Sequence, residues 1–264
     1  MTSIISPAHV LPASIIAAAL TMPTASLAAR ETPCMAEVAG EGRVSAVIDA
    51  RTLRLQDGRE VRLAGVEDAV SGVLTKPSQR AALENLVGSR EVTLRGSSTP
   101  DRYGRIVAMA FVQGQDQPVQ ARLIEDGHLV VTAAFDDEDC GSYLRKSEAR
   151  ARRAKRGLWA EPAALKNTEM PGDILAVVGQ FVVAEGRVQS VREAGATFYI
   201  NFGRRWTQDF AVTISRRNMA AFEAAGVPLK SLERKRVRVR GWVESRGGPR
   251  MHASWSGQIE VVGN

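Results

Sequence analysis

The stretch at residues 42–70 constrains the fold more than any other part of the chain. Apolar and polar residues alternate in its sequence, GRVSAVIDARTLRLQDGREVRLAGVEDAV, which predicts short strands. Ala50-Arg51 and the turn-forming pair Asp57-Gly58 connect them, so we expect an antiparallel meander. Its strands should lie at about residues 42–49, 52–56 and 60–67. Its turns and strand ends should present Asp49, Arg51, Arg62 and Glu67.

The segments that follow the meander predict further strands and three helices. The charged turn D-R-Y-G-R at residues 101–105 leads into a strand of β-branched and aromatic residues at 106–112. A strand is also expected at 91–95 and a brief extended segment at 128–134. Helices are predicted at residues 76–87, 118–126 and 140–156, with Gly88, Gly127 and Gly157 at their C-terminal ends.

Four motifs of this chain resemble those of the staphylococcal nuclease (thermonuclease) family. They are V-I-D-A-R-T, V-R-L-A-G-V-E-D-A-V, D-R-Y-G-R and S-E-A-R-A-R-R-A-K-R-G-L-W. The resemblance covers about residues 40–160, and D-R-Y-G-R and R-G-L-W are nearly verbatim. It implies a mainly β fold with helices (α+β), in which three helices accompany a five-stranded OB-type barrel.

The resemblance also implies a catalytic site, which this chain matches only in part. In the family, carboxylates hold calcium, a Glu acts as general base on water, and two arginines bind the scissile phosphate. Both arginines are present as Arg62 and Arg105, Tyr103 resembles a substrate contact, and Asp49 matches the first carboxylate. A second metal ligand is replaced by Arg51. Three further family positions differ. Glu67 occupies the position of an Asp, Ala69 that of a Pro, and Val70 that of the Glu that serves as base.

These departures predict a site that keeps phosphate affinity and has lost metal-dependent hydrolysis. A guanidinium at a ligand position repels a cation, and loss of a general base typically costs ~10²–10⁴ in rate. Arg51 either forms a metal-free cationic cluster with Arg62 and Arg105 or pairs with Asp49, Glu67 or Asp68, and the two arrangements can coexist. No cofactor is expected. Calcium at Asp49 and Glu67 belongs to the alternative of an active nuclease with a rearranged site.

The N-terminus and the cysteines indicate export. Residues 1–29 contain no Lys, Arg, Asp or Glu, an apolar run spans residues 10–20, and Ser26-Leu27-Ala28 is a small-x-small cleavage pattern. We therefore expect a signal peptide at residues 1–28 and a secreted or periplasmic protein. A disordered N-terminus and a retained anchor are the alternatives. Cys34 and Cys140, the only two cysteines, predict one disulfide in an oxidising compartment, or else two separate thiols.

The charge and the strand pattern change in the second part of the chain. Residues 30–170 hold 21 basic and 21 acidic residues, whereas residues 171–264 hold 14 basic and 8 acidic ones. The whole excess of +6 therefore lies in the C-terminal part, which favours an anionic partner there or serves solubility. Strands predicted at about residues 180–192, 197–202, 209–214, 235–244 and 250–262, with one helix at 216–225 after the third, indicate a second small OB-like β-barrel. The expected domains are a nuclease-like domain at 36–160, a linker at 161–172 and a basic barrel at 173–264.

One predicted strand of the second unit carries a candidate binding face. The sequence ERKRVRVRGWVE at residues 233–244 alternates arginines with valines, so the arginines and an indole should share one face. Basic and aromatic residues together suit single-stranded nucleic acid, although a charge-protected edge strand has the same pattern. The candidate residues on and near this face are Arg236, Arg238, Arg240, Trp242, Arg204, Arg205 and Trp206.

Three functions remain open at this point. The leading one is an exported, catalytically impaired nuclease-like protein (a pseudoenzyme) that binds single-stranded DNA or RNA or another polyanion. An active metal-dependent phosphodiesterase and a structural or protein-interaction module are the alternatives. His128 and His252 are isolated and predict no metal or catalytic site. No segment after the N-terminal region is long and apolar enough to span a bilayer.

Overall fold

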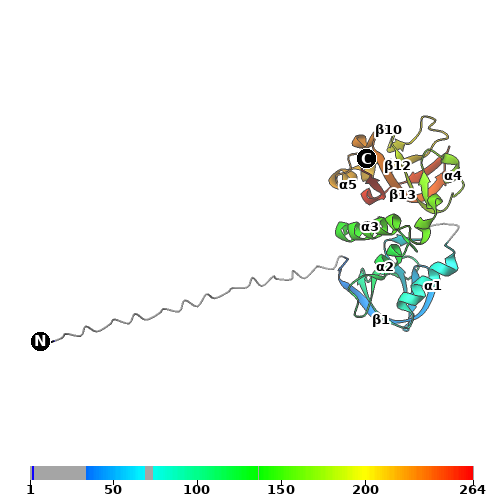
Figure 1. The fold of residues 1–264 in the computed structure, drawn as a ribbon. Helices are drawn as coiled ribbons and strands as arrows, with labels where there is room; N and C mark the ends of the chain where they lie inside the picture. Colours follow the sequence, from blue (N-terminus) through cyan, green and yellow to red (C-terminus); the bar gives the residue numbers. More distant parts are fainter. Residues whose placement is uncertain (1, 3–33, 69–73, 136, 264) are drawn as a thin grey trace. The chain divides into compact units, whose positions relative to one another are not determined.

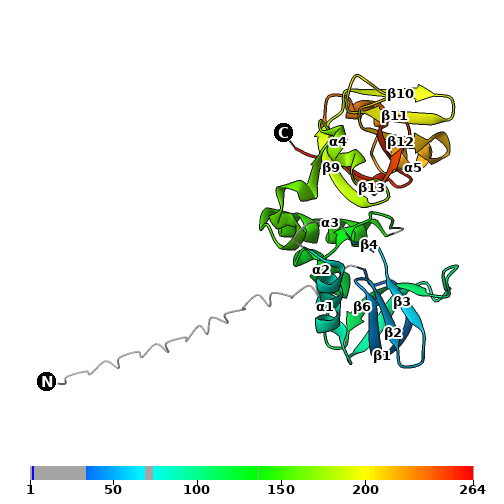
Figure 2. The same ribbon diagram turned by 90° about the vertical axis from the view of Figure 1, so that its right-hand side faces the viewer.

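The first half of the chain forms a closed five-stranded barrel with the neighbour order β1-β2-β3-β6-β5 (Figures 1 and 2). The structure is a computed structural model that describes residues 2, 34–68, 74–135 and 137–263. Strands β3 and β6 run parallel, and the other neighbouring pairs are antiparallel. The predicted OB-type barrel of an α+β protein is thereby confirmed. Its strands are β1 Val38–Asp49, β2 Thr52–Leu55, β3 Glu60–Leu63, β5 Glu91–Gly96 and β6 Ile106–Val112.

The third predicted strand of the meander is interrupted. It was expected to run through residues 60–67, but β3 ends at Leu63 and a separate strand, β4 Val66–Glu67, pairs with β7 Val130–Val131 instead. Gly65 lies between them with φ +71°, and a Cβ there would approach the Phe135 ring to 2.0 Å. Glycine therefore permits both the turn and the close packing, and β4 leaves the barrel carrying Glu67.

Three helices accompany the barrel, as expected. They are α1 Lys76–Val87, α2 Val119–Glu125 and α3 Glu138–Arg153. The Thr75 hydroxyl caps α1 by accepting from the Ser78 N–H at 3.3 Å, and Pro77 stands in its first turn. Asp137 caps α3 by accepting from the backbone of Asp139 and Cys140 at 2.9 and 3.0 Å. Local capping signals explain why these helices begin close to the predicted residues.

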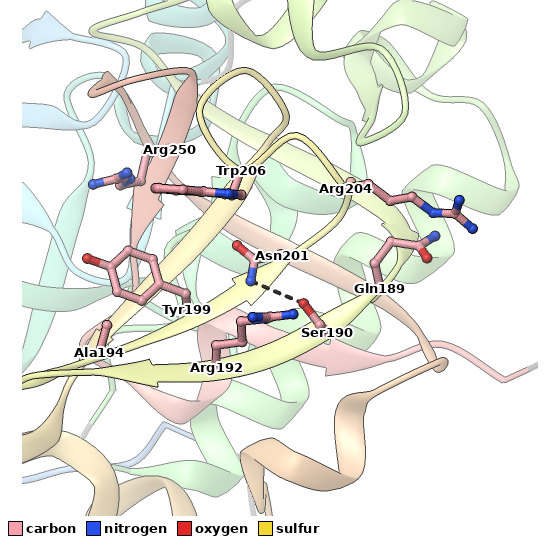
Figure 3. A pocket seen from close by; sticks show the side chains of 10 residues that line it. Gln189, Ser190, Arg192, Ala194, Tyr199, Asn201, Arg204, Trp206 and Arg250 are labelled. Atoms are coloured by element: carbon pink, nitrogen blue, oxygen red, sulfur yellow. Dashed lines mark hydrogen bonds between the residues drawn. The ribbon is translucent and has the colours of Figure 1, made fainter.

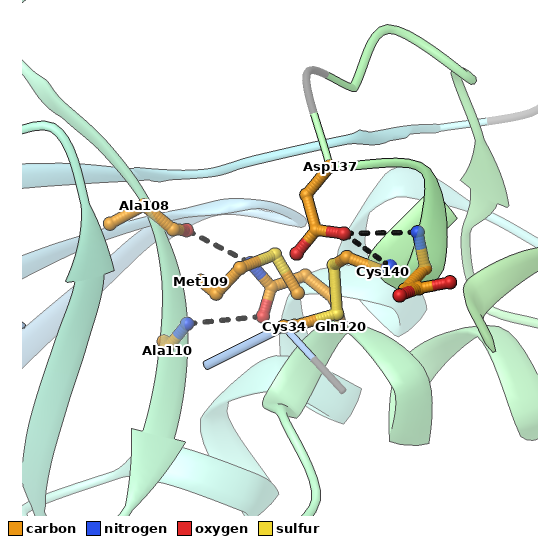
Figure 4. Close-up of a disulfide and its surroundings, with 8 residues drawn as sticks. Cys34, Ala108, Met109, Ala110, Gln120, Asp137 and Cys140 are labelled. Carbon is orange, nitrogen blue, oxygen red and sulfur yellow. Dashed lines mark hydrogen bonds between the residues drawn. A yellow bond between two sulfur atoms is a disulfide. The ribbon is translucent and has the colours of Figure 1, made fainter. Parts of the chain in front are cut away.

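A disulfide joins Cys34 to Cys140, which confirms the predicted bridge (Figure 4). Both cysteines are buried, and Cys140 lies in the first turn of α3 beside its Asp137 cap. Nearby, the buried Gln120 accepts from the Ala110 N–H at 3.2 Å and donates to the Ala108 carbonyl at 2.9 Å, which ties α2 to β6. The bridge fits an extracellular or periplasmic location. The predicted signal peptide lies almost wholly outside the described residues.

The second half of the chain forms an eight-stranded sheet with the order β10-β11-β12-β14-β13-β9-β8, with β15 paired to β13. Its apolar core includes Phe210, Phe222, Val237 and Val239, all nearly inaccessible to solvent. The strands are β8 Leu165–Asn167, β9 Phe181–Arg187, β10 Ser190–Ala194, β11 Thr197–Asn201, β12 Ala211–Ser215, β13 Arg236–Ser245, β14 Pro249–His252 and β15 Ile259–Val261. This half also contains the short α-helices α4 Pro171–Leu175 and α5 Met219–Ala224 and the 3-10 helices at Arg216–Asn218, Leu229–Leu232 and Ser256–Gln258.

The strand order of this sheet matches that of the first barrel when β9 and β10 are counted together as the counterpart of β1. Strands β11, β12, β14 and β13 then correspond to β2, β3, β6 and β5. The pair β12–β14 is parallel, as β3–β6 is, and β13 joins β14 to β9. However, Val188 and Gln189 separate β9 from β10, where one strand was predicted over residues 180–192. The hydrogen-bonded path is therefore an open sheet, and a second closed OB-like barrel is not confirmed.

The segment predicted to be a linker, residues 161–172, contains regular structure. Strand β8 lies within it and pairs in parallel with β9, and α4 begins at Pro171. The residues described from Cys34 onward belong to one compact unit. Among the described helices, none has the length and apolar composition required to cross a membrane.

Candidate functional site

The turn between β1 and β2 places two of the predicted site residues at one end of the barrel. Asp49 ends β1, and its carboxylate accepts from the Arg51 N–H at 2.9 Å, which fixes the turn. Arg62 on β3 lies opposite Thr52, because the two are register partners. Its Nη1 donates to the Thr52 hydroxyl at 2.7 Å and to Asp49 Oδ2 at 3.1 Å. The predicted residues Asp49, Arg51 and Arg62 are therefore neighbours.

The Arg51 side chain lies among the carboxylates predicted as its partners. Its Nε is 2.9 Å from Asp68 Oδ1, its Nη2 forms an ion pair with Glu67, and its Nη1 donates to the Val66 carbonyl at 3.2 Å. Burial and the nearby positive charge of Arg62 lower the pKa of Arg51 to about 10, against the opposing effect of the carboxylates. Arg51 is thus a positively charged group at neutral pH with all three guanidinium nitrogens in contact with an acceptor.

Arg105 and Tyr103 lie in the turn that precedes β6. Asp101 holds this turn, because its Oδ1 accepts from the backbone of Tyr103 and Arg105 at 2.9 and 3.0 Å. Its Oδ2 accepts from Arg105 Nε and Nη2 at 3.0 and 2.8 Å, which lowers the pKa of Asp101 to about 2. The exposed Tyr103 ring has the Arg102 and Arg105 guanidinium carbons 4.7 and 5.0 Å from its centroid. The positive charge of Arg105 also contributes to the lowered pKa of Arg62, whose largest cause is burial.

A pocket of about 430 Å³ opens beside Arg51 and Arg62. The first turns of α1 contribute Lys76 and Arg80 to it, which sequence reasoning missed. Their i, i+4 spacing and the absence of acidic residues from the first turn of α1 were the available signals. In the described part of the chain, neither residue forms an ion pair with a carboxylate. The lining holds four basic residues and two acidic ones, Asp49 and Asp68, so the pocket favours anions.

The carboxylates of this site do not fit a calcium ion. Calcium requires 6–8 oxygen ligands, several of them ionised. Here Glu67 and Asp68 are paired with Arg51, and Asp49 is bonded to Arg62. Among the described residues, no three His, Cys, Asp or Glu side chains come together in a way that could hold a metal ion. Val70, which takes the place of the expected base, lies outside the described residues.

The predicted arginine row on β13 is not a solvent-exposed face. Arg236 and Trp242 are exposed, but Arg238 and Arg240 are buried, with only 7% and 1% of their surface accessible. Arg238 pairs with Glu185 and Glu260 at 2.6 and 3.0 Å. The expectation that all four residues share a free face was wrong because carboxylates from distant segments cover its centre.

Arg240 forms the most deeply buried ion pair among the described residues. Its Nη1 and Nη2 lie 2.8 and 3.1 Å from the two carboxylate oxygens of Glu148 on α3, and Nη1 also donates to the Val131 carbonyl at 3.0 Å. Glu148 accepts in addition from the Val131 N–H and from Arg152, both at 2.9 Å. Because both charged groups are buried and bonded to each other, we interpret this network of side chains as structural.

A second pocket, of about 700 Å³, lies on β10, β11 and the segment that joins β11 to β12 (Figure 3). Two of its residues, Arg204 and Trp206, were predicted binding residues, whereas Arg205 pairs with Asp209 at 3.8 Å and does not line it. The residues missed from the sequence come from three different strands and are Arg192, Tyr199, Asn201 and Arg250. Neither histidine lines either pocket: His128 accepts from Gln79 through its carbonyl, and His252 contacts the Thr213 hydroxyl.

Comparison with known families gives a match for part of the barrel-containing half of the chain. Residues 75–161 match the family model described as staphylococcal nuclease homologue. The matched range contains Tyr103, Arg105 and helices α1, α2 and α3. Asp49, Arg51, Arg62 and Glu67 precede it, on strands β1 to β4 and their turns. Residues 75–161 are therefore similar to the staphylococcal nuclease homologue family, in agreement with the motifs found in the sequence.

Proposed function

We propose that this protein binds single-stranded nucleic acid and does not hydrolyse it by the calcium-dependent route of the nuclease family. The domain itself supports a nuclease-related or nucleic-acid-binding role. The observation that carries the proposal is the Arg51 guanidinium, which is ion-paired with Glu67 and Asp68 where the family resemblance places a metal ligand. Arg51 thus neutralises the carboxylates that a metal ion would otherwise neutralise.

Calcium would have to displace Arg51 before it could reach these oxygens. Breaking both ion pairs would leave Glu67, only 6% exposed, without its partner, and would place a dication close to Arg51 and Arg62. A carboxylate that loses its charged partner inside a protein typically costs ~3–5 kcal/mol. Val70 offers no proton acceptor, so even a captured cation would lack the base that prepares water for attack.

Phosphate binding survives this rearrangement. Arg62, Lys76 and Arg80 line the pocket beside Arg51, and guanidinium groups match phosphate oxygens in bidentate geometry. Such contacts release counterions from a nucleic acid, so binding should weaken steeply as the salt concentration rises. These side chains are therefore better suited to binding a polyanion than to hydrolysing it.

Replacing Arg51 with aspartate should create a calcium site. The Arg51→Asp variant removes the guanidinium that pairs with Glu67 and Asp68. It also adds one more carboxylate beside Asp49. Calorimetric titration should give calcium binding for Arg51→Asp, with a Kd of about 10⁻⁴–10⁻³ M, and no measurable heat for the wild type. Arg54→Asp is the matched control, because Arg54 lies on β2 only three residues after Arg51, is half-exposed and paired with Glu60, and should leave calcium binding absent.

An activity assay on the same variants tests the loss of hydrolysis. Wild-type protein and Arg51→Asp should leave single-stranded DNA and RNA intact in calcium, because both lack the base. The double variant Arg51→Asp/Val70→Glu should gain calcium-dependent cleavage. Calcium-dependent cleavage by the wild type that disappears in Arg105→Ala would refute the proposal.

Export completes the proposed function. The N-terminal apolar run, the cleavage pattern before Ala29 and the Cys34–Cys140 disulfide all support it. In a host that processes the signal peptide, the protein recovered outside the cytoplasm should begin at Ala29 by N-terminal sequencing. Full-length protein confined to the cytoplasm with two titratable thiols would contradict this.

A further inference from the structure

The pocket on β10 and β11 combines uncompensated positive charge with exposed aromatic rings. No Asp or Glu lines it, and within residues 74–135 and 137–263 its three arginines, Arg192, Arg204 and Arg250, have no carboxylate partner. At the first site, by contrast, Arg51, Arg62 and Arg105 each pair with a carboxylate, and only Arg80 of the described arginines there does not. Unpaired guanidinium groups that converge on one hollow are expected to attract an anion.

Trp206 stands on a loop that internal hydrogen bonds hold in place. Its surface is 73% exposed, the largest value among the exposed large hydrophobic residues of the described chain. The Asp209 carboxylate accepts from the Arg205 N–H at 2.8 Å, and the Asp209 N–H donates to the Arg205 carbonyl at 2.7 Å. A Cβ on Gly203 would lie 2.1 Å from Asp209 Oδ2, so glycine is needed for this closure. The indole is therefore presented to solvent by an ordered turn.

The floor of the pocket carries polar and aromatic groups from paired strands. Arg192 and Tyr199 are register partners across β10 and β11, and the Arg250 guanidinium carbon lies 5.6 Å from the Tyr199 ring centroid. The Asn201 amide donates to the Ser190 hydroxyl at 3.3 Å. Figure 3 shows Trp206 above Asn201, with Arg250 and Tyr199 on one side and Arg204 and Gln189 on the other.

We propose that this pocket binds single-stranded nucleic acid, with a base stacked on Trp206 and neighbouring phosphates held by Arg192, Arg204 and Arg250. A volume of about 700 Å³ accommodates a nucleotide and is more than a lone phosphate requires. Aromatic rings beside arginines are the usual combination in sites for single strands, because bases stack while cations follow the backbone. The amides of Asn201 and Gln189 provide donors and acceptors for a base edge.

Acidic polysaccharides offer the same negative charge but no aromatic ring, so they cannot form the π-stacking contact with Trp206 that a base forms. This inference rests on the proposed function in one respect, namely that the ligand is a nucleic acid. The pocket itself shares no residue with the Arg51 pocket. Variants in the two pockets can therefore be tested independently on the full chain.

The test measures binding of fluorescein-labelled 12-mers of dT and rU by anisotropy, together with the intrinsic tryptophan fluorescence on titration with the unlabelled 12-mers. Trp206→Ala should weaken binding about 5- to 150-fold and abolish most of the fluorescence quenching. Trp255→Ala is the matched control, because Trp255 is an exposed indole that does not line the pocket, and it should change neither readout. Heparin and polyphosphate should not quench the Trp206 emission.

The arginines are tested by the salt dependence of binding. Arg192→Ala should reduce the slope of log K against log salt by about 0.7, the value for one phosphate contact on a single strand. Arg217→Ala, an exposed arginine outside the pocket and without an ion pair in the described chain, should leave the slope unchanged.

Three results would overturn the inference, and they differ in what they leave standing. Oligonucleotide binding by Trp206→Ala and Arg192→Ala equal to that of the wild type would remove this pocket but keep the proposed function. Heparin binding with the same dependence on Trp206 would replace the nucleic acid with a general polyanion. Absence of oligonucleotide binding by the wild type at low salt would remove both proposals.

Discussion

Arg240→Met is expected to lower the free energy of unfolding by about 3–5 kcal/mol. Arg240 and Glu148 have accessible side-chain surfaces of 1% and 0%, so removing the guanidinium leaves a carboxylate inside the protein with only Arg152 to neutralise it. The Val131 carbonyl loses its donor as well. Urea unfolding at pH 7, followed by tryptophan fluorescence, measures the change directly.

Arg236→Met is the matched control, since the same strand carries both residues. Arg236 is about half-exposed and pairs with Glu185 at 2.6 Å. Exposed pairs typically contribute up to about 1 kcal/mol, so this variant should unfold near the wild-type midpoint. The double variant Arg240→Met/Glu148→Leu should recover part of the lost stability, because the unpaired charge is then gone. Equal effects of Arg240→Met and Arg236→Met would show that the buried pair contributes no more than a surface pair.

The effect of Arg240→Met should also depend on pH. Burial raises the pKa of Glu148, but Arg240 and the hydrogen bonds from Arg240 and Val131 outweigh it, so the net pKa is lowered from 4.5. A carboxyl group with a lowered folded-state pKa stabilises the protein fully above its unfolded-state pKa, and this contribution is lost as the pH falls through the folded-state value. The difference between wild type and Arg240→Met should therefore be larger at neutral pH than in acid.

Removal of the disulfide is the second change with a large expected effect. The bridge between Cys34 and Cys140 spans 106 positions of sequence, and a loop of that size restricts the unfolded chain by about 4–5 kcal/mol in the chain-entropy model. The variant Cys34→Ala/Cys140→Ala should therefore lose about 2–5 kcal/mol of unfolding free energy. Urea midpoints of the oxidised wild type and the variant provide the comparison.

Reductant provides the control for this prediction. Dithiothreitol should shift the wild-type midpoint toward that of the double variant and leave the variant itself unchanged. Identical midpoints for oxidised and reduced wild type would mean that the bridge does not restrict the unfolded ensemble. The segment before β1 is tied to α3 only through Cys34 among the contacts described above, so proteolysis at the N-terminal side should also increase after reduction.

The elements that the sequence predicted well are those with local signals. Helix α1 starts and ends at the predicted residues, because Thr75, Pro77 and Gly88 act within a few residues of its ends. The turn at Asp57-Gly58 follows from the positive φ of Gly58 at +88°. The break at Gly65 was missed, because the Phe135 ring that fills the space above it comes from a distant segment.

The candidate sites show the same division between local and distant causes. The alternation of residues on β13 predicted which side chains share a face. That Glu148 covers Arg240 on this face could not be predicted, because Glu148 lies 92 positions earlier in the sequence. The expected pairing of Arg51 with carboxylates is confirmed for Glu67 and Asp68, and Arg62 lies near enough to lower the pKa of Arg51. The Trp206 pocket was only partly predicted, because strand pairing brings Arg192, Tyr199 and Arg250 together.

Strand β8 has a consequence for how this protein can be divided. It lies within the segment that the sequence marks as a connector, yet it contributes an edge to the sheet of the following half by pairing with β9. A fragment that begins at residue 173 would lack β8 and expose the edge of β9. A fragment that ends at residue 160 would leave the Glu148 carboxylate without the Arg240 guanidinium. Cloning boundaries chosen from composition would thus cut through shared structure, and the two halves are better expressed as one polypeptide.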